Sequence, residues 1–311
     1  MAFAAVFPGQ GSQSVGMLSE LAAHNDAVRR TFGEASEALG FDLARLIAEG
    51  PAEDLDRTEN TQPALLAAGV AAWRAWQAAG GPRPVAMAGH SLGEYTALVA
   101  AGALDFDAAL RLVRLRGRYM QEAVPAGEGG MAAVLGLDAD EVGRLCADAA
   151  GDGLAAPANI NAPGQVVIAG DRKAVEAVAR LAEEAGAKKI VMLSVSAPSH
   201  CALMRPAAER LAEDLADIEL RRPELPVVNN AEVAAPDEPG AIRDALVSQL
   251  TSPVRWVEVV RSLKHDYGAE RLAEMGPGRV LSGLTRRIDR SMKALPVNDP
   301  ASLEAAIEAL S

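Results

Sequence analysis

The sequence predicts a helix-rich α/β protein, with a large domain built on a parallel sheet and a smaller α/β domain inserted into it. Half of the 311 residues are apolar and only 4% are aromatic, so the core is expected to consist mainly of Ala, Leu and Val. Strand-like runs alternate with helical patterns along much of the chain, which is typical of a parallel sheet covered on both faces. The length corresponds to about two domains.

The large domain is expected to take up residues 1–124 and 197–311. Its buried strands end in turn-forming residues or precede helical patterns. Strands are predicted at 2–7, 84–89, around 225–230 and, with a turn, over 271–278. Helices are predicted at 65–80, 91–104, 106–124 and 201–217.

Residues 125–196 show a different order of elements. Strands are predicted at 131–137, at two places within 159–170 and at 188–196, and helices at 138–150 and 171–186. The order βαββαβ within about 70 residues is that of a ferredoxin-like unit. A Pro- and Gly-rich stretch at the start, 125–130, is a suitable entry linker. The sequence therefore predicts a small ferredoxin-like domain inserted into the large one.

Charge and cysteine content exclude several classes of protein. Thirty Lys and Arg residues against 42 Asp and Glu give a net charge of −12, which argues against a nucleic-acid-binding protein. Two cysteines, Cys146 and Cys201, lie far apart and the chain has only four histidines, so no metal site of the usual spacing is expected. The first residues lack a basic segment, and no run of about 20 apolar residues could span a membrane. We expect a soluble cytoplasmic protein with reduced thiols.

One motif carries the chemistry. Gly89-His90-Ser91-Leu92-Gly93 matches the G-x-S-x-G nucleophile elbow, and it lies between a predicted strand and a predicted helix, as that mechanism requires. The helix N-terminus would supply amide hydrogens to a developing negative charge. The alternative is that Ser91 merely caps the helix that follows.

A nucleophilic serine needs a base, and histidine is the usual one. His90 is adjacent to Ser91, so its side chain leaves the chain in another direction. His24 and His265 lie in polar, charged segments that are typical of a protein surface. His200 lies in a Pro-containing loop at the domain junction, where it could enter a cleft. The alternative for a single histidine is ordinary packing or capping.

A single arginine also stands out. At about 100° per residue, Arg116 lies about 140° from Arg111 and alone on the apolar face of its predicted helix. A buried guanidinium keeps its charge and needs an anionic partner. That partner is either an internal Asp or Glu, or a substrate carboxylate held by a bidentate pair.

These residues resemble the malonyl-CoA:acyl carrier protein transacylase family of fatty acid synthesis, over almost the entire chain. The matching segments occur in the family's order. They are Phe7-Pro8-Gly9-Gln10-Gly11-Ser12-Gln13, Gly89-His90-Ser91-Leu92-Gly93-Glu94-Tyr95 with the later Arg116-Gly117, NAPGQVVIAG (161–170), Pro198-Ser199-His200, the stretch from Gln249 to Trp256, and Glu274-x-Gly276-Pro277-Gly278.

The resemblance implies an α/β-hydrolase-like large domain with a ferredoxin-like insertion, and it implies roles for single residues. Ser91 would be the nucleophile and His200 the base, oriented by the backbone carbonyl of Gln249. The amides of Leu92 and Gln10 would form the oxyanion hole.

The resemblance also implies how substrates bind. Arg116 would pair with the malonyl carboxylate, and Asn161 would make a weaker polar contact. The substrate would be malonyl-CoA, the acceptor the phosphopantetheine thiol of an acyl carrier protein, and no cofactor would be needed. We expect a monomer.

The acidic carrier protein would need a local basic patch on this acidic enzyme. Lys188 and Lys189, at the start of the last strand of the small domain, are one candidate. A second candidate is the group Arg286, Arg287 and Arg290.

Other functions remain compatible with the pattern. A serine esterase or thioesterase would use the same elbow with an acid between Ser91 and His200, and several acids lie there. An acyltransferase of a polyketide pathway would share the family's features; the small Ser199 leaves open how strictly malonyl is preferred over methylmalonyl. A catalytically inactive docking module is the alternative outside enzymes, but Ser91, His200 and Arg116 are all present.

Overall fold

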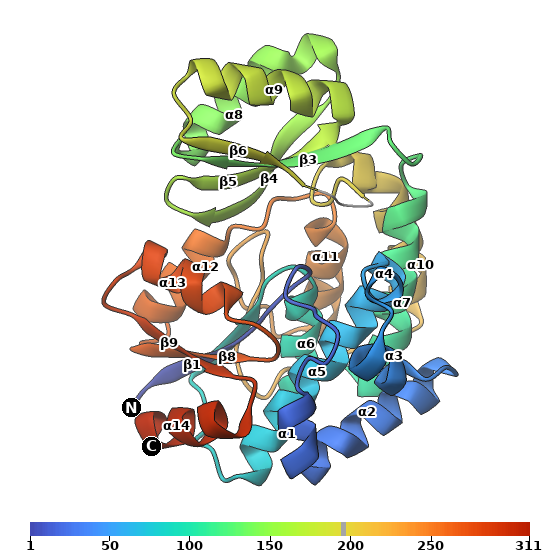
Figure 1. Ribbon diagram of the computed structural model, residues 1–311, viewed down its shortest axis with the longest axis vertical. Coiled ribbons are helices and arrows are strands. Elements are labelled where there is room, and N and C mark those ends of the chain that lie inside the picture. The colour runs from blue at the N-terminus through green and yellow to red at the C-terminus, as the bar shows by residue number, and fades with distance from the viewer. Residues whose placement is uncertain (194–196) are drawn as a thin grey trace.

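The computed structural model describes residues 1–193 and 197–311, which form two separate sheets with helices packed on them (Figure 1). The larger sheet and most helices make up the lower part of the view, and the smaller sheet with α8 and α9 lies above it. This arrangement confirms the predicted fold class. The domain boundaries at 124/125 and 196/197 stay a prediction, and residues 194–196 at the second boundary lie outside the described residues.

The larger sheet is parallel throughout and has the strand order β7-β2-β1-β8-β9. Its strands are β1 Phe3–Phe7, β2 Ala86–Gly89, β7 Val227–Val228, β8 Arg271–Met275 and β9 Lys293–Val297. In the register of β1 with β2, Phe7 lies opposite Gly89. Both strands therefore end at the same edge, and the loop after β1 lies beside the segment that contains Ser91.

Alternate residues of β1 pack on opposite faces of this sheet. Phe3, Ala5 and Phe7 belong to one hydrophobic cluster, while Ala4 and Val6 belong to another. The first cluster contains buried residues of α5, α6 and α7, and the second contains those of α12 and α13. Helices therefore cover both faces, which is why the strand has an unbroken apolar sequence.

The helices of the larger part include the three that carry the site, α5, α6 and α7. The full set is α1 Ser19–His24, α2 Asp26–Leu39, α3 Leu43–Glu49, α4 Ala52–Leu55, α5 Thr58–Ala78, α6 Leu92–Ala100, α7 Phe106–Glu122, α10 Arg205–Ala216, α11 Pro239–Gln249, α12 Trp256–His265, α13 Val280–Ile288 and α14 Pro300–Leu310, with a short 3-10 helix at Ala202–Met204.

The smaller sheet is antiparallel, with the order β4-β5-β3-β6. Its elements follow each other as β3 Gly129–Leu135, α8 Ala139–Asp148, β4 Ala155–Ala162, β5 Gln165–Asp171, α9 Arg172–Glu184 and β6 Lys189–Met192, with a 3-10 helix at Ala149–Asp152. The βαββαβ order and the central position of β3 and β5 match the predicted ferredoxin-like unit.

Several elements differ from their predicted bounds. The helix predicted at 65–80 begins at Thr58, and the first strand predicted within 159–170 begins at Ala155. The strand expected around 225–230 has only two residues, Val227 and Val228, because the chain turns back at Asn229, whose amide donates to the carbonyl of Ala234. The strand expected at 188–196 is described as Lys189–Met192, and its last three predicted residues lie outside the described part of the chain.

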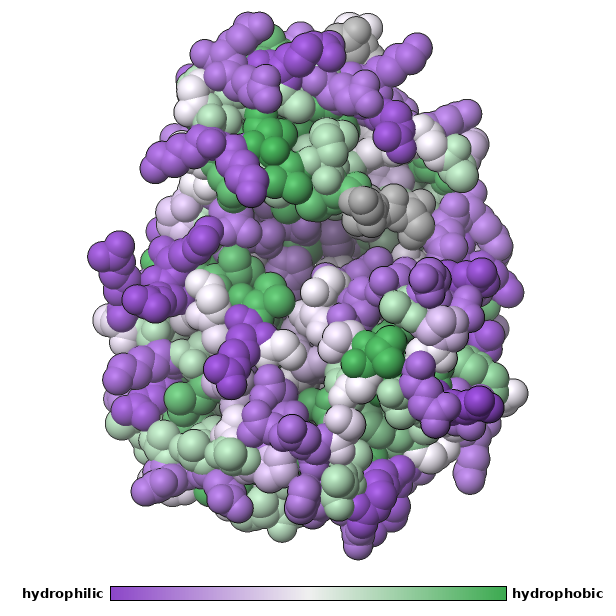
Figure 2. Space-filling view, in the orientation of Figure 1, coloured by the Kyte–Doolittle hydropathy of each residue, from purple (hydrophilic) through white to green (hydrophobic). Residues whose placement is uncertain are grey.

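Backbone hydrogen bonds join the segment before α12 to β4 of the smaller sheet. Val254 donates to the carbonyl of Ala158 and accepts from the amide of Ile160, both in β4. In the space-filling view, the surface between the upper and lower parts is hollowed (Figure 2). The junction is therefore fixed on one side and open on another.

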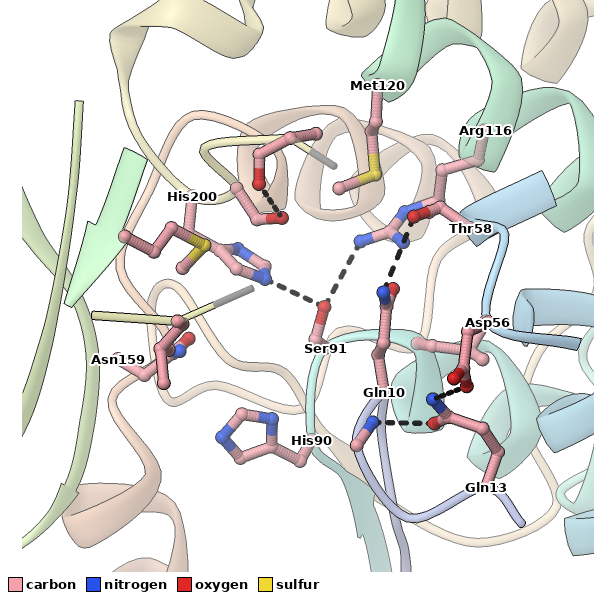
Figure 3. A pocket seen from close by; sticks show the side chains of 16 residues that line it. Gln10, Gln13, Asp56, Thr58, His90, Ser91, Arg116, Met120, Asn159 and His200 are labelled. Carbon is pink, nitrogen blue, oxygen red and sulfur yellow. Dashed lines mark hydrogen bonds between the residues drawn. The ribbon is translucent and has the colours of Figure 1, made fainter. Parts of the chain in front are cut away.

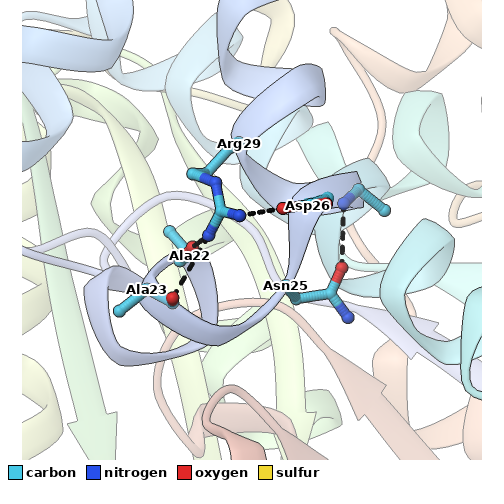
Figure 4. A network of polar contacts seen from close by, with 6 residues as sticks. Ala22, Ala23, Asn25, Asp26 and Arg29 are labelled. Atoms are coloured by element: carbon cyan, nitrogen blue, oxygen red, sulfur yellow. Dashed lines mark hydrogen bonds and ion pairs between the residues drawn. The ribbon is translucent and has the colours of Figure 1, made fainter.

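Away from this junction, a polar network fixes the turn between α1 and α2 (Figure 4). The Asn25 side chain caps α2 by accepting from the amide of Ala27 at 2.9 Å. Arg29 pairs with Asp26 and donates to the carbonyls of Ala22 and Ala23 at the end of α1. This network has no part in the site.

None of the described helices combines the length and the apolar character needed to cross a membrane. Residues 1–193 and 197–311 contain no group of three or more His, Cys, Asp or Glu side chains able to hold a metal ion.

Candidate active site

Ser91 lies at a sharp turn between β2 and α6. Its backbone has φ 51°, a conformation that is strained for a non-glycine residue and is typical of functional sites. The turn is tight because a Cβ on Gly89 would lie 1.8 Å from the carbonyl carbon of Gly93, and one on Gly93 would lie 2.1 Å from the carbonyl oxygen of Phe7. The two glycines of the motif are therefore required by close backbone contacts.

The Ser91 hydroxyl faces His200 (Figure 3). Oγ lies 2.7 Å from His200 Nε2, and His200 Nδ1 donates to the backbone carbonyl of Gln249 at 2.9 Å. With its proton on Nδ1, the imidazole presents a lone pair on Nε2 to the serine hydroxyl. The Ser91 side chain makes no capping bond to α6, so the helix-cap alternative does not describe it.

Burial keeps this imidazole neutral. His200 is 4% exposed, and burial together with the nearby charge of Arg116 lowers the pKa of His200 to about 3. Its φ of 62° is also in the left-handed region, so both partners of the pair lie on strained backbone. A neutral, fixed imidazole can act as a general base at neutral pH.

The other histidines lie elsewhere or bond differently. His24 and His265 are exposed. His90 donates from Nε2 to Asn161 Oδ1 at 2.8 Å, and burial lowers the pKa of His90. Asn161 therefore bonds to His90 and is not among the cavity-lining residues, whereas Asn159 is. A substrate contact by Asn161 stays a prediction.

Arg116 reaches the same place from α7 and is 1% exposed. Its Nη1 donates to Gln62 Oε1 at 2.7 Å, and its Nη2 donates to Gln249 Oε1 at 3.0 Å and to Ser91 Oγ at 3.3 Å. Its guanidinium also lies over the ring of Tyr95, 5.3 Å from the centroid. Among residues 1–193 and 197–311, no carboxylate forms an ion pair with it.

The two predicted oxyanion-hole residues, Gln10 and Leu92, line the cavity next to Ser91. The loop of Gln10 passes close to the elbow, since a Cβ on Gly9 would lie 2.4 Å from the carbonyl oxygen of His90. The neighbouring amides of Ser91 and Gly93 are bonded to Asn230 and to the His90 carbonyl. The Leu92 amide at the start of α6 suits the predicted role.

No role was predicted from the sequence for four side chains of the site. They are Gln62 and the side-chain amide of Gln249, which accept from Arg116, Glu94, which accepts from that amide, and Asn230. Asn230 accepts from the Ser91 amide at 2.6 Å and donates to the Gly89 carbonyl at 2.7 Å, so it braces both sides of the turn. Gln62 had a usable signal, because it is a polar residue at the start of a strongly apolar helix. Asn230 gave none, since its partner is 139 positions away.

The cavity that joins these residues has a volume of about 390 Å³ and lies between the two sheets. Gln10, Ser91 and Arg116 line it from the larger part, and Met131 and Leu193 line it from the smaller one. The predicted docking lysines are both exposed: Lys188 precedes β6, and Lys189 is the first residue of this strand, which ends just before Leu193.

The second basic group, at the end of α13 and just after it, is also exposed. Arg286, Arg287 and Arg290 line a separate surface pocket, and Arg287 donates to Gln165 at the start of β5. Neither basic group is bonded to the catalytic pair, so both stay predictions for docking.

Comparisons with known proteins agree with this geometry. The family model described as "Acyl transferase domain" matches residues 5–299. The malonyl CoA-acyl carrier protein transacylase of Salmonella typhimurium is 54% identical over 305 residues, covering 98% of each chain.

Solved structures agree with the sequence comparison. An acyl carrier protein S-malonyltransferase from Vibrio cholerae superposes with a TM-score of 0.96 at 55% identity, covering 98% of this chain and 99% of the other. A malonyl-transacylase solved in complex with a type II polyketide synthase acyl carrier protein gives 0.98 at 54% identity, covering 99% and 100%. The chain therefore belongs to the acyl transferase domain family and, within it, to the malonyl CoA-acyl carrier protein transacylases.

Proposed function

We propose that this enzyme transfers a malonyl group from malonyl-CoA to the phosphopantetheine thiol of an acyl carrier protein, through a malonyl ester on Ser91. One observation carries the proposal: the Ser91 hydroxyl lies between His200 Nε2, at 2.7 Å, and Arg116 Nη2, at 3.3 Å, in one cavity. A base for the hydroxyl and a cation for a carboxylate are what a malonyl transferase needs at one serine.

In the first half-reaction, Ser91 Oγ attacks the thioester carbonyl while His200 Nε2 takes the hydroxyl proton. The amides of Leu92 and Gln10 stabilise the oxyanion of the tetrahedral intermediate. The intermediate then releases the CoA thiolate, which takes the proton from His200 and leaves as the thiol. The bond from Oγ to the malonyl carbon replaces the carbon–sulfur bond.

The second half-reaction runs the same steps in reverse order. The phosphopantetheine thiol gives its proton to His200 Nε2 and attacks the ester, and the proton returns to Ser91 Oγ as the new thioester forms. The carbonyl of Gln249 fixes the tautomer of His200 but stabilises the imidazolium less than a carboxylate would. A thiolate leaves more readily than an amine, so this support is sufficient.

Arg116 gives the reaction its preference for malonyl over acetyl. A buried guanidinium with no ion-pair partner among the described residues gains one when the malonyl carboxylate enters. A charge-assisted pair of this kind contributes about 1.5–3 kcal/mol, or about 10–100-fold in selectivity.

A serine hydrolase is not favoured. A hydrolase triad would place an Asp or Glu on His200 Nδ1, and that nitrogen donates to the Gln249 carbonyl. We further propose that the enzyme needs no cofactor, acts in the cytoplasm as a monomer and serves fatty acid synthesis, and that residues 125–196 are an inserted domain.

The test is intact-mass measurement of the enzyme after separate incubation with malonyl-CoA and acetyl-CoA, in wild type and Ser91→Ala, followed by addition of carrier protein bearing phosphopantetheine. We expect malonyl-CoA to give an adduct on the wild type and none on Ser91→Ala, and we expect this malonyl group to pass to the carrier protein. An adduct that persists in Ser91→Ala would place the nucleophile elsewhere. An adduct that water removes as fast as the carrier protein does would favour a thioesterase.

A further inference from the structure

One buried acid in the site has no role in the mechanism above. Glu94 lies on α6, close to Ser91 in the sequence, and is 2% exposed. Its Oε2 accepts from Gln249 Nε2 at 2.8 Å and from the backbone amide of Asn230 at 2.9 Å. Two donors on one oxygen are suited to a carboxylate.

The Gln249 side chain connects this acid to Arg116. Its Oε1 accepts from Arg116 Nη2 at 3.0 Å, while its Nε2 donates to Glu94 and, at 3.1 Å, to the Ser91 carbonyl. The amide dipole is therefore aligned between a cation and a carboxyl group. The opposite amide orientation would bring its NH₂ against a guanidinium, which only donates.

The Gln249 side chain keeps the two buried charges, Arg116 and Glu94, from forming a direct ion pair. Neither Arg116 nor Glu94 forms an ion pair with any residue of the described chain. A buried charge without compensation is unfavourable, so each needs the other in the empty site. Because Gln249 stands between them, Arg116 Nη2 still reaches Ser91 Oγ and remains available to a substrate.

We propose that Glu94 is a positioning residue that supplies the counter-charge of Arg116 through the Gln249 amide, and that it takes up a proton when the malonyl carboxylate binds. The inference rests on the proposed function, because it requires a carboxylate at Arg116. It concerns a residue that neither contacts the reacting atoms nor lines the cavity.

The surroundings of Glu94 favour such a proton transfer. Burial raises the pKa of Glu94 to about 7, against the lowering effects of its bonds to Gln249 and Asn230 and of the charge of Arg116, while Glu232 raises it further. The other ionisable neighbour on α6 is Tyr95, whose pKa is raised by burial to about 12, so it stays neutral. His200, bonded to the same Gln249, is neutral as well, since its pKa is about 3.

Below pH 7 Glu94 is protonated, and a malonyl carboxylate meets Arg116 without a competing negative charge. Above pH 7 Glu94 is ionised, so the malonyl group either binds against its repulsion or binds while Glu94 takes up a proton from the solvent. The preference for malonyl-CoA over acetyl-CoA therefore decreases as pH rises through 7, by up to about tenfold between pH 6 and pH 8.

The experiment uses Ser91→Ala protein, which forms no ester, so that binding alone is measured. Malonyl-CoA and acetyl-CoA are titrated calorimetrically at pH 6, 7 and 8 in two buffers of different ionisation enthalpy. Acetyl-CoA corrects for the titration of the CoA phosphates. We expect the ratio of malonyl-CoA affinity to acetyl-CoA affinity to fall as pH rises. At pH 8, the protein should take up more protons when malonyl-CoA binds than when acetyl-CoA binds.

Two further substitutions in that background assign the effect. Glu94→Gln keeps an acceptor for Gln249 and Asn230 but no charge; we expect its affinity ratio to be independent of pH and its excess proton uptake to vanish. Glu232→Gln, at an exposed neighbouring acid, should keep both effects.

A flat ratio and no excess proton uptake in the Ser91→Ala protein would overturn the inference without any need for the Glu94 variant to fold. Unchanged pH dependence in Glu94→Gln would overturn it as well. These failures are distinct from failure of the proposed function, which would appear as the absence of a malonyl ester on wild-type Ser91.

Discussion

The two sides of the Ser91 hydroxyl are built in different ways. On one side, the turn and His200 lie on strained backbone; the Gln249 carbonyl orients His200, and the Asn230 side chain braces the turn through the backbone groups of Ser91 and Gly89. On the other side, Arg116 and Gln62 project from regular helices and are held by side-chain amides. In the proposed mechanism, every acyl group uses the first side, and only an acyl group with a carboxylate uses the second.

This difference separates the rate of acyl transfer from its selectivity. Changes on the side of the turn and His200 should slow malonyl and acetyl transfer alike. Changes on the side of Arg116 and Gln62 should alter the ratio between them. Each substitution below is therefore measured with both malonyl-CoA and acetyl-CoA.

The largest effect is expected for His200→Ala. Loss of the base should lower the rate of ester formation by about 10²–10⁴-fold for both acyl groups. Rapid-quench measurement of acyl-enzyme formation tests this, with the exposed His265→Ala as a control that should behave as wild type. A variant that retained half of the wild-type rate would show that another group takes the Ser91 proton.

Gln10→Pro should follow, with a loss of about 100-fold or more for both acyl groups, because proline removes the amide that the oxyanion needs. Gln10→Ala is the matched control, since it changes the side chain and keeps the amide. If the two variants have the same kcat/KM, the backbone of Gln10 has no part in the oxyanion hole.

Asn230→Ala should slow both acyl transfers by about tenfold and lower the free energy of unfolding by about 1–3 kcal/mol, because the Ser91 amide and the Gly89 carbonyl lose a buried partner. Denaturant unfolding and steady-state rates measure the two effects. Asn229→Ala, whose side chain bonds within its own turn, should leave the rates unchanged. A shift in the malonyl-to-acetyl ratio in Asn230→Ala would contradict the assignment of rate to one side of Ser91 and selectivity to the other.

The smallest effect is expected from Lys188→Glu combined with Lys189→Glu, which should raise the KM for carrier protein a few-fold at low salt and leave ester formation from malonyl-CoA unchanged. Reversal of two other exposed lysines, Lys173→Glu with Lys293→Glu, controls for net charge. An unchanged KM in the first variant would move the docking surface elsewhere, with α13 the next candidate.

The sequence was sufficient for features that depend on local patterns. The elbow followed from glycine spacing between a strand and a helix, the small sheet from element order, and the burial of Arg116 from its helical phase. The bracing amides were not predictable in this way. Asn230 and Gln249 meet Ser91 across 139 and 158 positions, and a polar residue gives no sign in sequence of which distant partner will satisfy it.

Asn161 illustrates the same limit from the other direction. Its turn-forming neighbours were visible in the sequence, but its bond to His90 spans 71 positions and left no sign there. The length of β7 was also set by tertiary contacts, since the chain leaves the sheet at the residues that brace the elbow.

The most direct test of the account is competitive loading of Ser91 with equal concentrations of malonyl-CoA and acetyl-CoA, read as the ratio of the two adduct masses in wild type and Arg116→Ala. We expect malonyl to predominate on the wild type and the ratio to fall by about 10–100-fold in the variant, with acetyl loading kept or increased. Equal loss of both adducts would mean that Arg116 only supports the structure, and would contradict the division between a side that reacts and a side that selects.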